Sequence, residues 1–422
     1  MAYVHGGSLL YGGANLPIFD AVNLVSQSLA MSRPIICVNF NYRVGLGGFL
    51  TSSAIHEELQ KDGHAGCGNF GLTDQNVAFK WVQSYISFLG GDKDNVTAVG
   101  ESAGGISISN QMCSASPPIF HRAVCMSGLS VSIPAWSIAR HEQLFETTCR
   151  HFDIDPKDPD VLSRLREIPQ QELANATPTI QGVPSGTGNP CLDGWFYRLD
   201  QSQLHEPPPW VQAFMLGDTY HEGVIFHLNI LDETYNSIRK TLRRHIRDEE
   251  QTDFILSEYQ ITPDLAHGAF LERVERMCGD AVFKIPNYAL SRGCKRLEQA
   301  GALFRYHFDQ RSRIKNAFEG TAYHAHELLY LFGNLDDKLN EDERGMAKEF
   351  ASSWIRFAHG ERPWDTEKGS MVWGPDSRHQ VKSEEEDEPV RNYSRMKSML
   401  NLGEGEAWKR WVAGVDALVN KR

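Results

Sequence analysis

The sequence predicts an α/β fold in which helices cover both faces of a mostly parallel β-sheet. Strand-like apolar runs alternate along the chain with segments of helical periodicity, and one of these runs passes through a glycine-rich turn directly into a helix. A continuous apolar run of strand length is typical of a strand that is buried on both faces. Strands that alternate with helices predict a parallel sheet covered on both sides.

The size and composition of the chain fit a globular protein with a large core. The chain has 422 residues, of which 41% are hydrophobic and 23% are charged. Sheets of this class commonly form one domain with insertions at this length. The formal net charge of −12 argues against nucleic acid and anionic membranes as main partners. No apolar run reaches the length of a membrane span, so we expect no transmembrane segment.

The beginning of the chain is unusual for a folded domain. The chain opens inside an expected strand, which runs into the glycine loop at residues 5–8. Folded domains seldom begin at a functional loop. We therefore expect the N-terminus to be truncated, with the first strands of the sheet missing and any signal peptide lost with them. Whether the protein is secreted or cytoplasmic, and its oligomeric state, are left open.

The cysteines indicate neither a disulfide scaffold nor a metal site. The eight cysteines are too sparse for a disulfide framework, and they lack paired metal-ligand spacing. Cys37 and Cys125 lie in apolar runs and are expected to be buried thiols. Cys278 and Cys294 are the pair that we would expect to form a disulfide.

The apolar and helical patterns predict the order of the elements. We expect one domain over residues 1–422, with helical insertions at about 138–205 and 232–300, where proline-broken or charged helical segments replace the alternating pattern. The segments 45–49, 52–68 and 384–388 are expected to be a turn, a polar loop and a solvated acidic loop. The expected helices are 74–89, the segment after Ser102, and 341–360. The expected strands are 3–4, 34–43, 95–99, 123–127, 210–216 and, as the last, 303–308.

The segment 95–105 carries the strongest chemical signal. A short β-branched run ends in Gly-Glu-Ser-Ala-Gly, and apolar residues then recur at helical spacing. This pattern is typical of a nucleophile elbow, a sharp turn from a strand into a helix with a serine at the bend. The strained turn requires small neighbours, which Gly100, Ala103 and Gly104 supply. Ser102 is therefore the predicted nucleophile.

A serine nucleophile needs a base and an acid that orients the base. In open α/β sheets such groups gather at the carboxyl ends of the strands, in the order serine, acid, histidine. Glu222 and Asp218 both follow the expected strand 210–216, and the residues alone do not separate them. His324 and His326 are both available after the strand 303–308. A metal at this histidine pair is not expected, because a third well-spaced ligand is lacking.

The loop at residues 5–8, His-Gly-Gly-Ser, has the composition of an oxyanion-binding loop, which a serine nucleophile also needs. Glycines allow the backbone to approach the substrate and direct N–H groups at a developing oxyanion. The predicted oxyanion donors are the N–H groups of Gly7, Ser8 and Ala103. A phosphate-binding loop is the weaker interpretation, because no Lys-Ser/Thr pair follows the glycines.

Taken together, these segments resemble the type-B carboxylesterase/cholinesterase family of α/β-hydrolases. The resemblance is densest over residues 3–130 and continues at 217–223 and 324–333. The motifs that carry it are His-Gly-Gly-Ser at 5–8, Asn-Tyr-Arg-Val-Gly at 41–45, Gly-Asn-Phe-Gly-Leu-Thr-Asp-Gln at 68–75, Trp-Val at 81–82, Gly-Gly-Asp at 90–92, and Val-Thr through Gly-Gly at 96–105.

The resemblance implies an α/β-hydrolase that cleaves small-molecule carboxylic esters through an acyl-enzyme intermediate, without cofactor or metal. The resemblance also selects one candidate for the acid and one for the base. The family acid is a glutamate directly before a glycine, which matches Glu222, and its histidine precedes a carboxylate by three residues, which matches His324 with Glu327. Gly6 and Glu101 are expected to line the substrate site, where Glu101 would favour neutral or cationic substrates.

The chain also departs from the family pattern. Ser8 stands where the family usually has a third glycine, which leaves a backbone donor but predicts a tighter pocket. The aromatic residue that holds choline in cholinesterases belongs to the segment expected to be missing, so cholinesterase specificity is not expected. A catalytically inactive interaction protein of the same family, or an inactive truncated esterase, is the alternative function.

Overall fold

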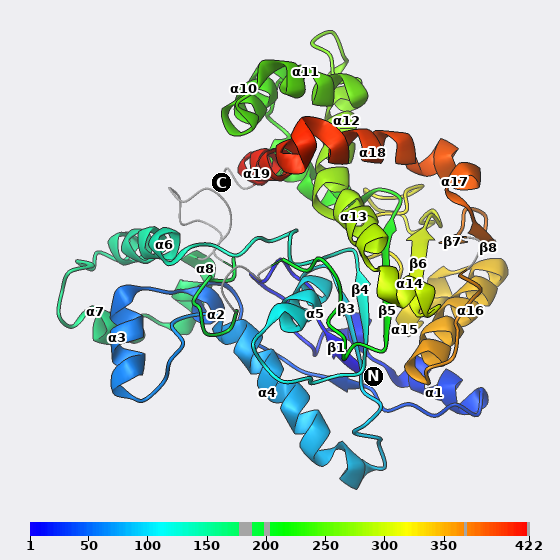
Figure 1. Ribbon diagram of the computed structural model, residues 1–422, viewed down its shortest axis with the longest axis horizontal. Coiled ribbons are helices and arrows are strands. Elements are labelled where there is room, and N and C mark those ends of the chain that lie inside the picture. The colour runs from blue at the N-terminus through cyan, green and yellow to red at the C-terminus, as the bar shows by residue number, and fades with distance from the viewer. Residues whose placement is uncertain (177–187, 198–202, 367–368, 420–422) are drawn as a thin grey trace.

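A single β-sheet forms the centre of the molecule (Figure 1). The computed structural model describes residues 1–176, 188–197, 203–366 and 369–419, and within them eight strands follow the order β2-β1-β3-β4-β5-β6-β7-β8. Neighbouring strands run parallel except for β7 and β8, which are antiparallel. The strands are β1 (Ala2–Val4), β2 (Val38–Asn39), β3 (Thr97–Glu101), β4 (Arg122–Met126), β5 (Ala213–Thr219), β6 (Leu303–Phe308), β7 (Ser370–Trp373) and β8 (His379–Lys382).

Both faces of the sheet are covered by helices. Side chains alternate along a strand, so Ala123 and Cys125 of β4 join one hydrophobic cluster and Val124 and Met126 join another. The first cluster contains residues of α4, α5, α13 and α14, and the second contains residues of α1, α15 and α16. The predicted α/β class is therefore confirmed. These helices are α1 (Val22–Ala30), α4 (Phe70–Tyr85), α5 (Ala103–Cys113), α13 (Ile285–Gly293), α14 (Lys295–Gln299), α15 (Leu328–Phe332) and α16 (Glu341–Ala358).

Most of the remaining helices form two groups outside these layers. In Figure 1, α10 to α12 gather with α18 and α19 at the top, and α2, α3 and α6 to α8 lie at the left. The division into one domain with two insertions stays a prediction. The bounds are α2 (Gly45–Phe49), α3 (Ser53–Lys61), α6 (Ile138–His151), α7 (Val161–Glu167), α8 (Gln170–Ala176), α9 (His227–Ile230), α10 (Tyr235–Ile246), α11 (Glu249–Glu258), α12 (His267–Gly279), α17 (Glu384–Arg391), α18 (Tyr393–Asn401) and α19 (Glu406–Val419).

Several short helical turns complete the described chain. Among the described helices, none combines the length and the apolarity that crossing a bilayer would require. The turns are η1 (Pro17–Phe19), η2 (Ile86–Leu89), η3 (Glu222–Phe226), the π-helix η4 (Asp280–Lys284), η5 (Asp336–Lys338) and η6 (Leu402–Gly405).

The expected buried strand at 34–43 is wrong in length and in burial. Only Val38 and Asn39 are strand, and both are half-buried. The reason is position, because β2 lies at the edge of the sheet and pairs only with β1. An apolar run shows that a segment is shielded from water, but it does not show how many neighbours it has.

Four other expectations are wrong, because three segments expected to be a turn or loops contain helices and two short strands follow the strand expected to be the last. The expected turn at 45–49 is α2, and the expected loop at 52–68 contains α3, whose N-cap Ser52 accepts a hydrogen bond from the Ile55 N–H. The acidic run at 384–388 begins α17, which carries a capping box between Ser383 and Glu386. The strand at 303–308 is not the last, because β7 and β8 follow it.

The expected disulfide is also wrong. All eight cysteines are free thiols, and Cys278 and Cys294 belong to different hydrophobic clusters. Cys125 is fully buried, as expected, whereas Cys37 is half-buried.

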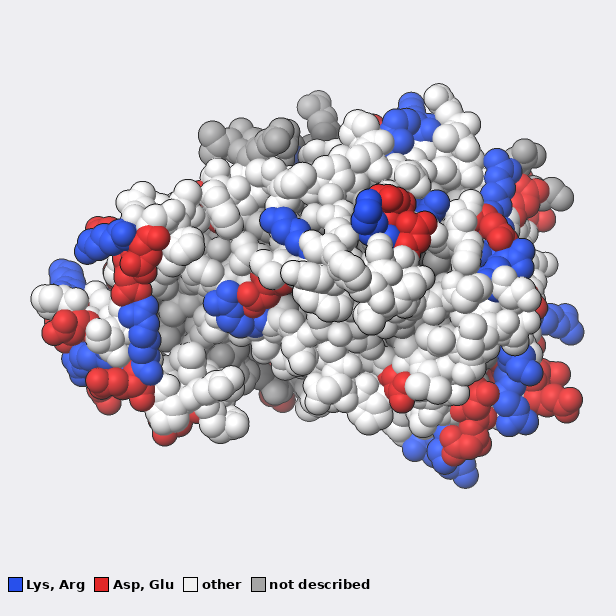
Figure 2. Space-filling model, turned by 90° about the horizontal axis from the view of Figure 1, so that it is seen from below, with Lys and Arg blue, Asp and Glu red and all other residues white. Residues whose placement is uncertain are grey.

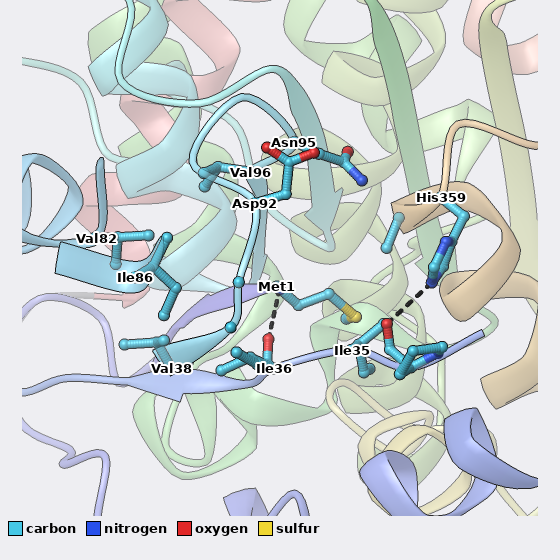
Figure 3. Close-up of a pocket in the computed structure, with 14 residues that line it drawn as sticks. Met1, Ile35, Ile36, Val38, Val82, Ile86, Asp92, Asn95, Val96 and His359 are labelled. Atoms are coloured by element: carbon cyan, nitrogen blue, oxygen red, sulfur yellow. Dashed lines mark hydrogen bonds between the residues drawn. The ribbon is translucent and has the colours of Figure 1, made fainter. Parts of the chain in front are cut away.

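A cavity of about 360 Å³ lies beside the edge strand β2 (Figure 3). Its walls are mainly aliphatic and include Ile36, Val82 and Ile86. The N-terminal amine of Met1 donates a hydrogen bond to the Ile36 carbonyl (2.7 Å) at its centre. Size alone would select this cavity as a binding site, but it is lined by neither Ser102 nor any other predicted site residue.

Charged side chains are not gathered by sign on the face shown in Figure 2. Acidic and basic side chains lie intermingled at the two ends of this face, and smaller groups that contain both signs lie between them. The excess of 54 acidic over 42 basic residues therefore does not produce a continuous acidic patch on this face.

Candidate active site

Ser102 lies on a sharp turn between β3 and α5. Its backbone has φ 55° and ψ −124°, a conformation that costs energy for any residue with a side chain. The Ser102 N–H donates to the Met126 carbonyl (2.8 Å), and Ile106 N–H donates to the Ser102 carbonyl (2.9 Å). A Cβ on Gly104 would lie 2.0 Å from the Val4 carbonyl oxygen, so this position admits no side chain. The surrounding sheet thus fixes the strained serine in place.

Glu222 begins η3, just beyond the end of β5, and its side chain is buried. One carboxylate oxygen, Oε1, accepts hydrogen bonds from Thr219 N–H (2.6 Å) and Ser127 Oγ (2.7 Å). The other oxygen, Oε2, accepts a hydrogen bond from His324 Nδ1 (2.5 Å). The structure therefore places Glu222, and not Asp218, against the predicted base.

A backbone bridge explains why these two side chains meet. His221 and Tyr323 form a parallel bridge, in which His221 N–H donates to the Ala322 carbonyl (2.9 Å). These two bridged residues come directly before Glu222 and His324. The loops after β5 and β6 are thus held together at the point where the acid and the histidine leave the backbone.

His324 is buried, and its ring contacts the ring of Phe283 with centroids 4.7 Å apart. Its second nitrogen, Nε2, lies 3.1 Å from Glu101 Oε1 and has no hydrogen-bond partner in the described part of the chain. Direct contact between Nε2 and the Ser102 hydroxyl is therefore not formed in this state. The alternative histidine, His326, has a different partner: its Nδ1 donates to the Gln310 carbonyl (3.1 Å).

Three buried carboxylates surround His324 and set its charge. Burial lowers the pKa of His324, but the charges of Glu101 and Glu222 outweigh burial and raise the pKa to about 9. Burial raises the pKa of Glu101 to about 7, although the nearby His324 opposes this effect. Burial, with the charges of Glu101 and Glu222, also raises the pKa of Glu327. The imidazolium form is thus stabilised by carboxylates on both nitrogens.

Replacing Glu101 with glutamine tests this electrostatic balance. The neutral amide removes one charge that raises the pKa of His324, so that pKa falls and the histidine becomes a competent base at lower pH. We expect the acid limb of the kcat/KM profile to move by about one pH unit or more toward acid. Asp416→Asn is the control, because Asp416 lines the same pocket, whereas the charges that raise the pKa of His324 are those of Glu101, Glu222 and Glu327. An unmoved limb in Glu101→Gln would contradict the prediction.

The glycine loop lies directly over the nucleophile. A Cβ on Gly6 would meet the Glu101 carbonyl oxygen at 2.9 Å and the Ser102 Cβ at 3.1 Å. Gly7 has φ 118° and Ser8 has φ 57°, both positive values that favour glycine, and Ser8 lines the same pocket as Ser102. Ala103 is the first residue of α5. The structure thus brings Gly6, Ser8 and Ala103 next to Ser102, and Gly7 lies between Gly6 and Ser8 in the chain.

The pocket at Ser102 has a volume of about 90 Å³ and is mainly apolar. Sequence reasoning missed most of its wall, since the π-helix η4 contributes Val282 and Phe283 and the last helix α19 contributes Val412 and Asp416. A π-helix frequently marks a functional site, but no local pattern announces it. The lining residues are Ser8, Leu10, Ser102, Ile106, Ser132, Ile133, Gly188, Asn189, Ile225, Phe226, Val282, Phe283, Val412, Asp416 and Val419.

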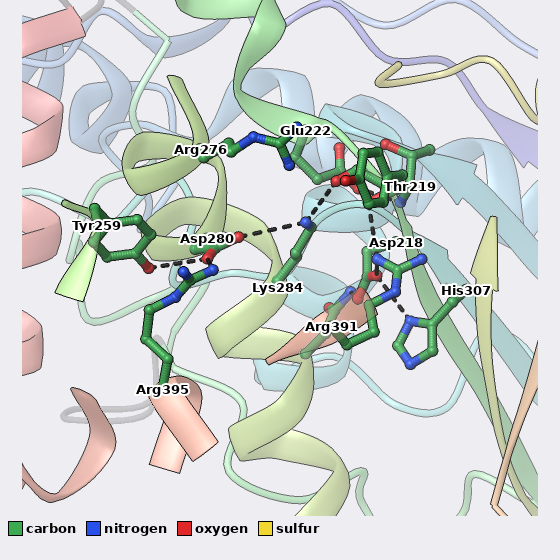
Figure 4. Close-up of polar contacts among 12 residues, drawn as sticks. Asp218, Thr219, Glu222, Tyr259, Arg276, Asp280, Lys284, His307, Arg391 and Arg395 are labelled. Carbon is green, nitrogen blue, oxygen red and sulfur yellow. Dashed lines mark hydrogen bonds and ion pairs between the residues drawn. The ribbon is translucent and has the colours of Figure 1, made fainter. Parts of the chain in front are cut away.

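A buried ionic network lies next to Glu222 and is linked to it through Thr219 (Figure 4). Arg391 of α17 is fully buried, donates to Asp218 Oδ1 (2.8 Å) and the Thr219 carbonyl (3.1 Å), and contacts Asp309. Burial would raise the pKa of Asp218, but His307 and Arg391 lower it to about 2. Asp218, the rejected alternative for the acid, is thus a structural ion-pair partner at the end of β5.

Loss of this arginine is expected to destabilise the fold. Arg391→Met leaves the buried carboxylates of Asp218 and Asp309 without their cation, which costs about 3–5 kcal/mol of unfolding free energy. Chemical denaturation at neutral pH measures this loss as a lower midpoint with an unchanged slope. The matched control is Arg239→Met, whose partner Asp253 lies at the surface and whose loss costs less than about 1 kcal/mol. Equal midpoints for both variants would contradict the prediction.

The fold and site together define an α/β-hydrolase. Solved structures with the same fold include a thermophilic PNB esterase (TM-score 0.72, 22% identity, 92% of this chain and 79% of that chain) and a PNB esterase (TM-score 0.71, 23% identity, 94% and 80%). The family model described as "Carboxylesterase family" matches residues 1–401. The chain therefore belongs to the carboxylesterase family. This membership, together with its esterase relatives, identifies the chain as a carboxylic ester hydrolase.

Curated relatives carry related descriptions. Lipase 3 of Yarrowia lipolytica is 26% identical over 86% of this chain and 68% of its own length. The para-nitrobenzyl esterase of Bacillus subtilis is 28% identical over 86% and 71%. Pyrethroid hydrolase Ces2e of Rattus norvegicus is 30% identical over 88% and 64%. The chain thus spans about two thirds of the length of these relatives.

Proposed function

We propose that this chain hydrolyses carboxylic esters of small molecules through a Ser102, His324 and Glu222 triad and an acyl-enzyme intermediate. The observation that carries the proposal is the 2.5 Å hydrogen bond from His324 Nδ1 to Glu222, formed beside a serine on a strained turn that lines a pocket. A serine hydroxyl is a poor nucleophile at neutral pH, and such a pair is the arrangement that activates it.

In the first step the Ser102 oxygen attacks the acyl carbon of the ester. His324 Nε2 accepts the hydroxyl proton, for which the imidazole turns from Glu101 toward Ser102. Catalytic hydrogen bonds are often long or misaligned before substrate binds, so this small rotation belongs to substrate binding. Glu222 holds the Nδ1–H tautomer and stabilises the imidazolium that forms.

The tetrahedral intermediate carries a negative charge on the former carbonyl oxygen. We assign its stabilisation to the N–H groups of Gly7, Ser8 and Ala103, the last at the positive end of α5. His324 then returns its proton to the leaving alcohol, and the acyl group stays on Ser102. A water molecule activated by the same histidine attacks the acyl carbon and releases the acid.

The pocket favours neutral esters with small apolar groups. Its walls carry aliphatic and aromatic side chains, and its acidic groups are Asp416 on α19 and the nearby Glu101. Carboxylates in a cavity of about 90 Å³ disfavour an anionic substrate through charge repulsion. Gly6 and Glu101 are the residues that we expect to meet the ester group first.

Covalent labelling tests the nucleophile without assuming the natural substrate. The full chain is treated with a fluorophosphonate probe, and hydrolysis of p-nitrophenyl acetate is followed in parallel. We expect one label, on the peptide that carries Ser102, and parallel loss of turnover. Ser132→Ala is the matched control, because Ser132 lines the same pocket but donates its hydroxyl hydrogen to the Val282 carbonyl (2.6 Å). Turnover that survives in Ser102→Ala, or a folded chain that neither labels nor turns over, would contradict the proposal.

A further inference from the structure

Two cysteines far apart in sequence meet beside a segment that lines the Ser102 pocket through Gly188 and Asn189. Cys67 lies in the segment between α3 and α4, and Cys191 lies in a segment that bridges to Trp136. The Asn69 side chain ties these segments together: its Nδ2 donates to the Cys191 carbonyl (2.8 Å), and the Cys191 N–H donates to Asn69 Oδ1 (2.7 Å). The two backbones are therefore held in a fixed relation beside both thiols.

The thiols themselves are in contact. The side chains of Cys67 and Cys191 hydrogen bond to each other, and both are buried, with exposures of 3% and 0%. A Cβ added at Gly68, the neighbour of Cys67, would lie 3.2 Å from the Cys191 Cβ. A disulfide requires two cysteines side by side on backbones that need not move. The contact between the two thiols and the close approach of Cys191 to the backbone at Gly68 place the two residues side by side.

We propose that Cys67 and Cys191 form a redox site, in which hydrogen peroxide converts the two thiols into a disulfide that locks one wall of the Ser102 pocket. The site is separate from Ser102, His324 and Glu222, so the proposal goes beyond ester hydrolysis and does not depend on it.

The reaction is a two-step oxidation by one molecule of peroxide. The Cys67 sulfur displaces water from hydrogen peroxide and becomes a sulfenic acid, Cys–SOH. The Cys191 sulfur then attacks the Cys67 sulfur, forms the S–S bond and releases a second water molecule. Two thiols thus lose two electrons and two protons in total, and the peroxide is reduced to two water molecules.

The environment assigns different roles to the two cysteines. The hydrogen bond with Cys191 lowers the pKa of the Cys67 thiol, against the effect of burial, while the same contact and burial raise the pKa of Cys191. A thiolate is the reactive form toward peroxide, so Cys67 is the attacking residue and Cys191 resolves the sulfenic acid. Burial limits the oxidant to a molecule as small as hydrogen peroxide.

The bond would stiffen a segment that reaches the pocket. Cys191 comes two residues after Asn189, which lines the pocket at Ser102, and Gly188 lines it as well. A link between residues 67 and 191 closes a long loop of the unfolded chain, which stabilises the native state when native geometry is not disturbed. Because Asn69 already fixes both segments, we expect oxidation to raise the Tm by about 5 °C.

Peptide mapping tests the proposal on the full chain. Protein purified under reducing conditions is titrated with hydrogen peroxide, free thiols are blocked with iodoacetamide, and the chain is digested without reductant. We expect a peptide pair joined through Cys67 and Cys191 that is two hydrogen atoms lighter than the sum of its parts. Reduction should separate the pair. Cys37, the half-buried thiol, reports whether the peroxide dose is sufficient.

Three variants define the outcome. Cys37→Ser should form the link and show the rise in Tm, whereas Cys67→Ser and Cys191→Ser should show neither. A folded wild-type chain in which Cys37 is oxidised but residues 67 and 191 stay unlinked overturns the proposal. A link from either residue to a different cysteine also overturns it, as does a correct link with an unchanged or lower Tm, since the bond would then not fit the native arrangement. The mapping needs no esterase activity, so failure of the proposed function would be seen separately.

Discussion

Replacing His324 with alanine is expected to lower kcat/KM for p-nitrophenyl acetate by about 10⁵-fold. Without the imidazole, the Ser102 hydroxyl has no base, and Glu222 has no group to orient. The proposed oxyanion donors at Gly7 and Ser8 would still bind the substrate carbonyl, so a small residual rate above that of water is expected. Steady-state kinetics on folded protein, with circular dichroism to verify the fold, measures the loss.

His326→Ala is the matched control for this prediction. Both histidines are buried on the same short loop, but His326 donates to the Gln310 carbonyl and stacks on Tyr323 with centroids 4.6 Å apart. We expect the control to lose stability and to keep its activity per folded molecule within about tenfold of the wild type. Equal losses in both variants would mean that the loop, and not the His324 base, limits the reaction.

Replacing Gly223 with alanine is expected to lower the unfolding free energy by more than about 5 kcal/mol. The new Cβ would lie 1.7 Å from the Glu275 carbonyl oxygen and 2.4 Å from its carbon, both backbone atoms of α12. Because backbone cannot rotate away as a flexible side chain can, η3 and α12 must separate. Glu222 begins η3, so the movement also removes the acid from His324.

The control for Gly223 is a glycine without steric conflict. A Cβ on Gly345, an exposed position inside α16, meets nothing within 4 Å. Gly345→Ala is expected to stabilise the protein by about 0.5–1 kcal/mol, because alanine loses less conformational entropy in a helix. Thermal unfolding and soluble yield compare the two variants. A Gly223→Ala protein that unfolds near the wild-type temperature would show that the two backbones can part at low cost.

The sequence predicts the centre of the fold well because the necessary signals are local. The strand at 303–308 has its expected bounds, and α16 begins at Glu341 as expected, since an apolar run and a cap with helical periodicity each lie within one segment. The elbow at Ser102 is also local, because a strained turn needs small residues directly beside it. The edge strand at 38–39 was overestimated, because the number of neighbouring strands is a property of the whole sheet.

The wall of the pocket could not be predicted in the same way. Phe283 and Val412 lie 181 and 310 residues after Ser102, and nothing in their local sequence indicates that they face it. The same holds for the contact of His324 Nε2 with Glu101, which depends on side-chain rotation. The bridge between His221 and Tyr323 has no sequence signature either, because it arises from the neighbouring positions of β5 and β6.

The ion pair of Arg391 with Asp218 affects the order in which parts of the molecule fold during synthesis. The two residues are 173 positions apart, so during synthesis β5 leaves the ribosome long before its cation exists. Until then Asp218 has His307 but not Arg391 as its partner, and the contact of Arg391 with the Thr219 carbonyl, close to the turn that carries Glu222, is missing. Contacts between such distant residues form late and slowly. The nucleophile elbow can therefore fold early from local contacts, whereas the acid side of the site gains its last ion-pair partner only when α17 has been made.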